Sequence, residues 1–285
     1  IRRALMRNVS MDVTVDNIMQ TNPVTAHLGE DKRAIIQLMR RKDLLQVPIL
    51  DREQKLVGLE TMQDLLIGEQ RENPVLLMAG GFGKRLYPRT QELPKPLLAI
   101  GNKPILESIV EQLADAGFVR FFLSVHYKAD LVQAHFGDGS AWGVSISYLE
   151  ERKPLGTGGA LGLIPKEALD SPILMVNGDL LTKLDFGALL RFHEIHEGVA
   201  TICVRKYKVE IPYGVVELNE SRLISIFEKP IKQSFVNAGI YVLNPRAVKE
   251  IERDRRLDMP DFLRQCISRG EEVNAFPIHE YWIDI

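Results

Sequence analysis

A glycine-rich segment followed by two cations contains the residues whose types and spacing most directly suggest chemistry. The apolar run Val75–Ala79 ends in Gly80-Gly81-Phe82-Gly83, Arg85 comes two residues later, and Lys95 stands between two prolines. Glycines let backbone N–H groups approach an anion closely, because no Cβ stands in the way. Arginine offers a planar fork that matches phosphate oxygens, and a lysine between prolines adds a cation on a restricted backbone. The segment therefore predicts a loop that binds a polyphosphate.

Two well-known phosphate-binding loops do not fit these residues. The dinucleotide fingerprint needs a third glycine where Leu86 stands. The P-loop needs Ser or Thr where Arg85 stands, and a glycine where Met78 stands. The remaining alternative is a glycine-rich turn with solvated cations. The strand, the glycines and Pro94-Lys95-Pro96 occur together, which favours the phosphate loop.

Two carboxylates at distant places are candidates for a metal site. Asp179 ends the largely apolar segment Ile173–Asp179, and Asp284 follows Tyr281-Trp282-Ile283 near the end of the chain. Two carboxylates at strand ends can share one Mg²⁺, whose other ligands would be triphosphate oxygens and water. Taken alone, Asn-Gly-Asp is also a common turn sequence.

Several short motifs follow the glycine loop in a fixed order. They are Leu155-Gly-Thr-Gly-Gly-Ala160, Asn177-Gly178-Asp179, Tyr213-Gly214, Glu228-Lys229-Pro230, Asn237-Ala-Gly-Ile-Tyr241 and Trp282-Ile-Asp284. With the glycine loop and Pro94-Lys95-Pro96, this order resembles the sugar-1-phosphate nucleotidyltransferases, or NDP-sugar pyrophosphorylases. The resemblance runs from about Pro74 to the last residue, and the family's usual Thr before the arginine is Lys84 here.

This resemblance implies nucleotidyl transfer with Mg²⁺ as the cofactor. An oxygen of a sugar-1-phosphate would attack the α-phosphorus of an NTP, giving an NDP-sugar and pyrophosphate, with catalysis by positioning and charge. Arg85 would hold the departing phosphates, and Lys95 would neutralise the α-phosphate and the incoming phosphate. Asp179 and Asp284 would hold the metal. The implied nucleotide-binding residues are Ala79, Gly80, Gly81, Gly83, Glu151, Gly156 and Thr157.

The same resemblance assigns four residues to the sugar phosphate. Lys229 would bind the phosphate, Glu228 and Asn237 would bind sugar hydroxyls, and Gly214 would let the backbone approach the ring. The alternative for Glu228 and Lys229 is a solvated ion pair, which is what most adjacent Glu-Lys pairs are. Pro230 and the downstream Asn237 motif favour the functional interpretation.

The identity of the base depends on Glu151. By resemblance, a side chain five residues before Gly156 contacts the base, and that residue is Glu151 here. A carboxylate only accepts hydrogen bonds, and guanine offers N1–H and N2–H₂ side by side. GTP is therefore the expected nucleotide. The alternatives are that Glu150 takes this role, or that Glu151 faces solvent.

Composition limits the other possibilities. The 285 residues are 45% apolar with a net charge of −2, which suits two ordinary domains and gives no electrostatic case for nucleic acid or an anionic membrane. The sequence contains neither a membrane-length apolar run nor a signal peptide, and its two cysteines lie far apart, so a cytoplasmic protein is expected. The ends at Ile1 and Ile285 suggest a fragment of a longer protein.

The elements that must position these residues alternate between strand and helix. Strands are expected at Val75–Ala79, Phe121–Val125, Val144–Tyr148 and Ile173–Asn177, and helices at Ile105–Ala116, Ala129–His135, Gly159–Leu163 and Phe186–His196. This alternation predicts an α/β fold, a Rossmann-like, mostly parallel sheet with ligands outside the carboxyl ends of its strands. Later strands are expected at Ala200–Arg205, Tyr213–Leu218, Leu223–Glu228 and Val236–Leu243, which would carry the sugar pocket.

Residues 1–70 are expected to form a separate, small α+β domain, and residues 74–285 the nucleotidyltransferase domain. The pattern predicts helices at Asp31–Arg41 and Met62–Ile67 and a hairpin of Val47–Leu50 with Lys55–Leu59. Asn22-Pro-Val24, Val47-Pro48-Ile49, Gly58 and Thr61-x-x-Asp64 resemble one CBS repeat, with Ile1–Leu5 as the tail of a preceding one.

The CBS resemblance implies an adenine nucleotide at Thr61 and Asp64, and pairing of repeats across subunits, so a homo-oligomer is one expectation. The alternative for Thr61 is a helix N-cap, since Thr before a helix accepts first-turn N–H groups in any case. Two rival functions stay open. One is a non-catalytic scaffold with the same fold, which the presence of Arg85, Lys95 and Asp179 argues against. The other is an adenine-nucleotide sensor with an attached transferase.

Overall fold

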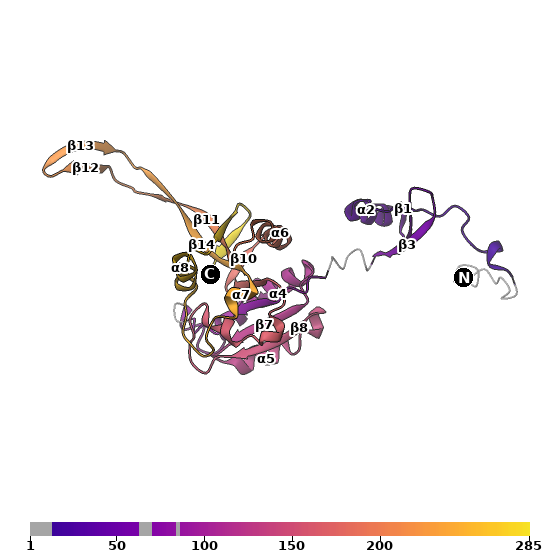
Figure 1. Cartoon of the computed structure of the whole chain (residues 1–285), viewed down its shortest axis with the longest axis horizontal. Coiled ribbons are helices and arrows are strands. Elements are labelled where there is room, and N and C mark those ends of the chain that lie inside the picture. Colours follow the sequence, from indigo (N-terminus) through magenta and orange to yellow (C-terminus); the bar gives the residue numbers. More distant parts are fainter. Residues whose placement is uncertain (1–12, 63–69, 84–85) are drawn as a thin grey trace. The chain divides into compact units, whose positions relative to one another are not determined.

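The computed structural model describes residues 13–62, 70–83 and 86–285. The chain divides into two compact units, Ile1–Gly68 and Glu69–Ile285, and each is described by itself (Figure 1). The predicted domain limits of 1–70 and 74–285 stay a proposal. Among the described helices, none has the length and apolar content needed to cross a membrane.

The first unit is a three-stranded sheet with one long helix. Its elements are η1 (Val15–Asn17), β1 (Ala26–His27), α2 (Lys32–Lys42), β2 (Gln46–Leu50) and β3 (Leu56–Thr61). Strand β2 pairs in parallel with β1 and antiparallel with β3. Ile35 and Met39, one helical turn apart, pack on Ala26, Val47 and Ile49 of the sheet. The expected helix Met62–Ile67 lies, after Met62, outside the described residues.

The second unit is built on a seven-stranded sheet in the order β15-β11-β14-β9-β4-β7-β8. In chain order these strands are β4 (Val75–Met78), β7 (Arg120–Val125), β8 (Ser145–Glu150), β9 (Ile173–Asn177), β11 (Ala200–Glu210), β14 (Ile231–Leu243) and β15 (Val273–Ile278). Only β14 runs antiparallel to its two neighbours in this sheet of described strands. This arrangement confirms the predicted mostly parallel α/β fold.

The apolar run of β4 explains its central place in the sheet. Val75 and Leu77 pack in one hydrophobic cluster and Leu76 in another, because alternate side chains of a strand point to opposite faces. A strand that is apolar on both faces is typical of a parallel sheet covered on both sides. The covering helices are α4 (Ile105–Asp115), α5 (Ala129–Phe136), α6 (Phe186–His196), α7 (Pro245–Val248) and α8 (Met259–Ser268).

Several short elements complete this unit. The 3₁₀ turns are η3 (Lys95–Leu97), η4 (Ser140–Trp142), η5 (Gly159–Leu163) and η6 (Lys166–Ala168). The small two-stranded sheets pair β5 (Ala99–Ile100) with β6 (Lys103–Pro104), β10 (Leu180–Thr182) with β16 (Trp282–Asp284), and β12 (Val215–Asn219) with β13 (Arg222–Phe227). The predicted helix at Gly159–Leu163 is thus a 3₁₀ turn, and α8, β10, β15 and β16 were not expected.

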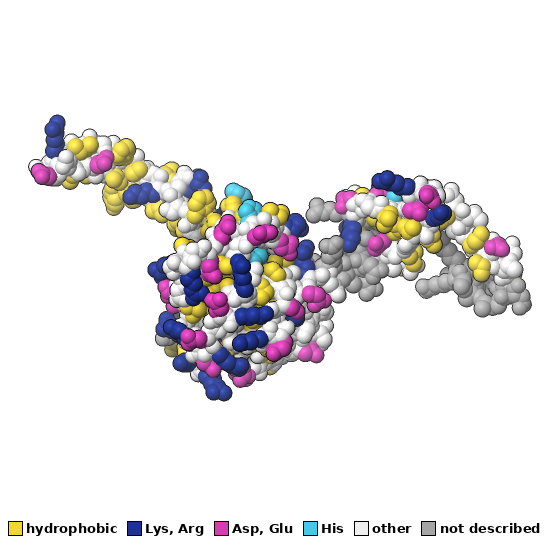
Figure 2. All heavy atoms as spheres, viewed as in Figure 1, with side chains coloured by type: hydrophobic (Ala, Val, Ile, Leu, Met, Phe, Trp, Pro, Cys, Tyr) yellow, Lys and Arg dark blue, Asp and Glu magenta, His cyan; other side chains and the backbone are white. Residues whose placement is uncertain are grey.

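A long two-stranded arm, residues 206–236, extends from the sheet. Strands β11 and β14 pair as far as Glu210 and Ile231, whereas β15 pairs only with Ala200–Arg205 of β11 and β9 only with Ile240–Leu243 of β14. Strands β12 and β13 lie at the far end of this arm (Figure 1). Its surface carries many exposed hydrophobic side chains (Figure 2).

Candidate nucleotide-binding site

The carboxyl ends of β4 and β9 lie at a cavity of about 260 Å³. It is lined by Met78, Gly80, Gly81, Phe82, Glu151, Pro154, Gly156, Thr157, Asn177, Gly178 and Asp179. Segments far apart in the sequence therefore meet here, because parallel strands bring the loops after them to one edge of the sheet. Most of the residues that the sequence assigns to the nucleotide border this one space.

A close ion pair lies beside the cavity. The Nζ atom of Lys95 is 2.7 Å from Oδ2 of Asp179, and the two side chains are 17% and 29% exposed. Lys95 begins the turn η3, directly after Pro94. The restricted proline backbone and the partial burial both limit where the ammonium group can go. The pair places one positive and one negative charge at the same edge of the sheet.

The glycine loop folds back onto this lysine. Gly83 has a φ of +61°, and a Cβ at this position would lie 3.1 Å from the Cβ of Lys95 and 2.7 Å from Cγ2 of Thr90. The Thr90 hydroxyl donates a hydrogen bond to the Gly83 carbonyl at 3.0 Å. Only glycine fits both this backbone conformation and this spacing. The loop is therefore held against the Pro-Lys-Pro segment. Arg85 lies outside the described residues.

The two candidate metal ligands come from neighbouring backbone segments. Strand β10 begins directly after Asp179 and pairs with β16, so that Leu180 lies opposite Asp284. The backbone N–H of Ile285 donates to the Asp179 carbonyl at 3.2 Å. Within the described residues, the side-chain oxygen Oδ1 of Asn177 is buried without a hydrogen-bond partner. Carboxylate and amide oxygens are ligands that a hard divalent cation accepts, so the types of these residues fit Mg²⁺. The described residues contain no cluster of three or more His, Cys, Asp or Glu side chains that could hold a metal by themselves.

Glu151 is buried at the cavity wall rather than turned to solvent. It is 8% exposed, its Oε1 accepts a short hydrogen bond from the Ser124 hydroxyl, and its Oε2 accepts from the Leu155 N–H at 2.8 Å. Glu150, in contrast, is exposed and its carboxylate accepts from Gln133 at 2.8 Å. The solvent-facing alternative for Glu151 is therefore wrong. Ser124 was not predicted, although a serine inside the buried strand Arg120–Val125 was a usable signal.

One predicted nucleotide residue, Ala79, directly precedes Gly80 of the cavity lining. Ala79 is buried, and its N–H donates to the Ser124 carbonyl at 2.9 Å, which continues the pairing of β4 with β7. Phe82, which lines the cavity and was not predicted, lies 5.4 Å from the His126 ring and 5.6 Å from the Tyr127 ring, between ring centroids.

The two residues predicted to contact an adenine nucleotide belong to the first unit. Thr61 is half-buried at the end of β3, opposite Gln46. Asp64 lies outside the described residues.

The predicted sugar-phosphate residues are not gathered at the cavity. Gly214 directly precedes β12, and a Cβ there would lie 3.1 Å from Oε2 of Glu228, so these two residues face each other across the arm. Lys229 follows Glu228, and none of the three is among the described residues that line the cavity. Their assignment to the sugar phosphate stays a prediction.

Asn237 lies closer to the sheet than the other three. Its Nδ2 donates to the Tyr241 hydroxyl at 2.6 Å, and its Oδ1 accepts from the Gly239 N–H at 2.9 Å. Gly239 in turn packs against Asn177 of the cavity wall, where a Cβ would lie 2.6 Å from the amide nitrogen. Asn237 is therefore two residues from a direct neighbour of the cavity.

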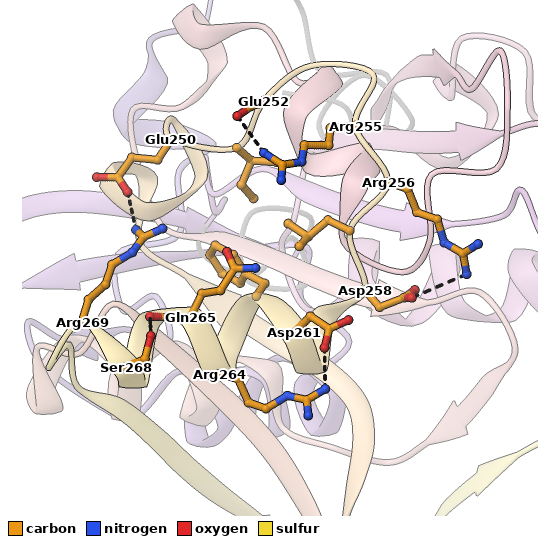
Figure 3. Close-up of a pocket in the computed structure, with 13 residues that line it drawn as sticks. Glu250, Glu252, Arg255, Arg256, Asp258, Asp261, Arg264, Gln265, Ser268 and Arg269 are labelled. Atoms are coloured by element: carbon orange, nitrogen blue, oxygen red, sulfur yellow. Dashed lines mark hydrogen bonds and ion pairs between the residues drawn. The ribbon is translucent and has the colours of Figure 1, made fainter.

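A second, larger hollow of about 720 Å³ lies between residues 250–258 and α8 (Figure 3). Four arginines and four acidic residues line it, and they pair with one another, for example Arg269 with Glu250 and Arg255 with Glu252. Their charges cancel, so the hollow offers no net attraction to an anion.

The sequence matches two known families. It matches the nucleotidyl transferase family over residues 74–285 and the CBS domain over residues 15–68. It is 37% identical over 219 residues to the mannose-1-phosphate guanyltransferase of Aspergillus fumigatus, and 34% identical over 220 residues to that of Schizosaccharomyces pombe. Each alignment covers 74% of this chain and 60% of the relative, so the chain spans about 60% of the length of these relatives.

The fold of this chain is also similar to that of solved structures. One is a putative glucose-1-phosphate thymidylyltransferase from Bacillus anthracis, with a TM-score of 0.60 and 25% identity, covering 74% of this chain and 89% of that one. Another is HddC from Yersinia pseudotuberculosis in complex with GMP-PN, with a TM-score of 0.56 and 27% identity, covering 74% and 93%.

Proposed function

Because the chain belongs to the nucleotidyl transferase family, we propose that residues 74–285 transfer GMP from GTP to a sugar-1-phosphate. A phosphate oxygen of the sugar-1-phosphate attacks the α-phosphorus of GTP in line. The new P–O bond forms as the bond between the α-phosphorus and its bridging oxygen breaks, and pyrophosphate leaves with the electron pair. The products are a GDP-sugar and pyrophosphate, and the reaction needs no covalent enzyme intermediate.

The observation that supports this proposal most directly is the Lys95–Asp179 pair beside the glycine loop. A metal-bound triphosphate needs a carboxylate for the metal and a cation for its phosphate oxygens. Both charges stand at the cavity edge, 84 residues apart in sequence. Lys95 would bind the α-phosphate and the incoming phosphate, where negative charge must be stabilised in the transition state. Arg85 would hold the departing phosphates.

Mg²⁺ is the cofactor in this proposal, with Asp179 and Asp284 as its protein ligands. When bound, the ion would supply a Lewis acid and a template for the reacting phosphates. The residues themselves bind and orient. Gly81 has open space where a Cβ would stand, so a phosphate can approach its backbone N–H closely, and Gly80, Gly156 and Thr157 form other parts of the cavity lining.

Guanine is the proposed base because of Glu151. Its buried carboxylate lines the cavity, and each carboxylate oxygen has a second lone pair beyond the bond it accepts from Ser124 or Leu155. Guanine presents two adjacent donors to such an acceptor, whereas uracil and thymine present one. Relatives named as guanyltransferases and a neighbour solved with GMP-PN support the same choice.

Mannose-1-phosphate is the first sugar phosphate to test, because the relatives are named for it. Glucose-1-phosphate is the second, because a structural neighbour is named as a putative glucose-1-phosphate thymidylyltransferase. Gly214, Glu228, Lys229 and Asn237 would contact this substrate. For the CBS portion we propose an adenine nucleotide as ligand, with Thr61 and Asp64 as contacts, and association of identical chains. We place the protein in the cytoplasm.

A substrate matrix tests the reaction. The purified chain is incubated with Mg²⁺, one of GTP, ATP, UTP or dTTP, and one of the two sugar phosphates, and pyrophosphate release is measured. We expect release only when both substrates are present, fastest with GTP and mannose-1-phosphate, and abolished by a chelator. Faster release with UTP or dTTP would contradict the base assignment.

If no combination of substrates releases pyrophosphate, the proposed transfer reaction is contradicted. It would favour the scaffold or the sensor, which calorimetric titration with AMP and ATP separates. A sensor binds the adenine nucleotide, whereas a scaffold binds neither it nor GTP.

A further inference from the structure

The loop Leu155–Gly159, which supplies part of the cavity wall, is bonded to the segment Leu257–Met259 about a hundred residues away. The Leu257 carbonyl accepts from the N–H groups of Gly158 and Gly159 at 2.8 and 3.0 Å, and the Leu257 N–H donates to the Leu155 carbonyl at 2.9 Å. Three backbone hydrogen bonds at one crossing fix the two segments relative to each other.

The glycines of this loop allow the close approach. Gly156 has a φ of +78°, and a Cβ there would lie 2.5 Å from Oδ1 of Asp258 and 2.7 Å from the Leu257 carbonyl oxygen. A Cβ on Gly159 would lie 2.6 Å from the Arg255 carbonyl oxygen. Real side chains do not occupy such distances, so the glycines bring the loop backbone directly onto the segment that precedes α8.

Two side chains add a reciprocal pair of bonds at the same crossing. Oδ1 of Asp258 accepts from the Thr157 N–H at 3.1 Å, and Oγ1 of Thr157 accepts from the Met259 N–H at 2.9 Å. Asp258 is the N-cap residue of α8, yet within that fully described helix its side chain makes no capping hydrogen bond. A first-turn N–H of α8 is instead bonded by Thr157, which therefore does part of the capping residue's work from another segment.

We propose that Asp258 is a positioning residue for nucleotide binding, acting through Thr157. Its carboxylate fixes the backbone of Gly156 and Thr157, both of which line the cavity. The same loop begins at Leu155, whose N–H donates to Glu151. Asp258 thus determines the geometry of this part of the cavity wall without lining the cavity itself. This inference rests on the proposed function, because it assumes that the cavity binds GTP.

Asp258 and Asp261 form a matched pair for the test. Both carboxylates border the same hollow beside α8, and each pairs with an arginine, Asp258 with Arg256 at 3.7 Å and Asp261 with Arg264 (Figure 3). Asp258 also bonds the cavity loop, whereas the contact drawn for Asp261 stays within α8. Replacing either removes one acid from the hollow, but only one replacement disturbs the loop.

The kinetic test compares Asp258→Ala, Asp258→Asn and Asp261→Ala with the unaltered chain. Asp258→Ala should raise the KM for GTP and the calorimetric Kd of GTP by about tenfold, the size of one hydrogen bond to a charged acceptor. Its kcat should change little, since Asp258 contacts no reacting atom. Asp258→Asn keeps a side-chain oxygen for Thr157 and should regain most of the affinity. Asp261→Ala should match the unaltered chain.

Hydrogen exchange in the ligand-free protein tests the bonding itself. Asp258→Ala should speed exchange at residues 155–159. Thr157→Val, which keeps the shape but loses the oxygen, should speed exchange in the first turn of α8, and Thr157→Ser should restore it. Equal exchange and equal GTP affinity in Asp258→Ala and Asp261→Ala would overturn the inference, as would a loss confined to kcat.

The same measurements separate this inference from the proposed reaction. An unaltered chain that releases no pyrophosphate but binds GTP, and binds it less tightly after Asp258→Ala, would refute the transfer reaction and support the positioning role. If the unaltered chain and Asp258→Ala both release pyrophosphate normally, with the same KM for GTP, the transfer reaction is supported and the positioning role is refuted.

Discussion

The cavity and the arm of the second unit both carry residues that the sequence assigns to substrates, but their backbones are held very differently. Around the cavity, β4 and β9 have neighbours on both sides, and the loops are bonded to distant segments. In the arm, the outer parts of β11 and β14 pair with each other only, as far as the described chain shows. The candidate residues at the cavity lie close together because many long-range hydrogen bonds fix the backbone there. The candidate residues on the arm are held only by a two-stranded ladder, and they lie away from the cavity.

The far end of the arm illustrates the second case. Val216 lies opposite Ile226, and Leu218 lies opposite Leu223 beyond a bulge. All four side chains are at least half exposed. A two-stranded ribbon with a bare apolar face has little stability of its own in water. Gly214, Glu228 and Lys229 stand on this ribbon, so their distance from the cavity depends on the arm and not on the sheet.

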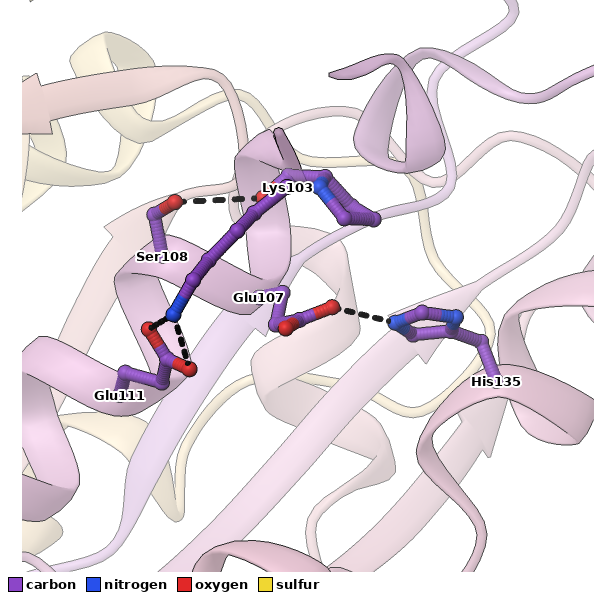
Figure 4. A network of polar contacts seen from close by, with 6 residues as sticks. Lys103, Glu107, Ser108, Glu111 and His135 are labelled. Carbon is purple, nitrogen blue, oxygen red and sulfur yellow. Dashed lines mark hydrogen bonds and ion pairs between the residues drawn. The ribbon is translucent and has the colours of Figure 1, made fainter. Parts of the chain in front are cut away.

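The largest expected effect is at the cavity. Lys95→Ala should lower turnover by roughly 100- to 1000-fold, because it removes one positioned cation from the site of charge development. Pyrophosphate release under saturating substrates measures this. The matched control is Lys103→Ala, whose ammonium contacts both oxygens of Glu111 at 2.7 Å in a separate polar network (Figure 4). Near-normal turnover of folded Lys95→Ala protein would show that this cavity is not the catalytic site.

The next effect tests how tightly the cavity loop is held. Gly156→Ala and Gly143→Ala both place a side chain on a left-handed backbone, with φ of +78° and +68°. Both should lose roughly 1–2 kcal/mol of unfolding free energy. Only at Gly156 would the Cβ meet neighbours, since Gly143 faces open space among the described residues. Urea unfolding should show a further loss of about 1–3 kcal/mol for Gly156→Ala. Equal losses would mean that the loop can move away.

A smaller effect is expected on the arm. Lys229→Ala should raise the KM for the sugar-1-phosphate by about tenfold, the scale of one hydrogen bond to a charged group. The Kd of GTP and the melting temperature should not change, because the exposed Lys229 supports no packing. Lys232→Ala, another arm lysine, opposite Val209, is the control. If Lys229→Ala behaves like Lys232→Ala, this arm lysine plays no part in sugar-phosphate binding.

The smallest effect concerns stability rather than substrates. Burial lowers the pKa of His193 below its ordinary 6.5. Above that pH the histidine is neutral in both states, and as pH falls the unfolded chain takes up the proton first, so stability is lost through the lowered folded pKa. His193→Gln should flatten this loss in urea unfolding between about pH 7 and pH 5. His196→Gln, exposed on the same helix, should leave the pH dependence intact.

Local patterns predicted many elements well. The strand Ile173–Asn177 and the helix Phe186–His196 have the expected bounds, because continuous apolar residues and helical spacing are local signals. Helix α8 was missed although Met259, Phe262, Leu263 and Cys266 are buried at helical spacing. Pro260 in its first turn hides this pattern, yet proline is tolerated there. Strands β11 and β14 run longer than predicted because their outer parts pair with each other. The polar residues in these outer parts do not indicate a strand in the local pattern.

The sequence by itself determined the family, the types of many elements, and which residues could bind phosphate, metal and base. The tertiary structure alone decided that Lys95 meets Asp179, that Thr157 meets Asp258, and that Glu151 is buried with Ser124. It also left Glu228 and Lys229 on the arm. Residue types and local spacing follow from neighbours in the chain. Contacts across 84 or 101 residues follow from strand order and packing, which no short pattern encodes.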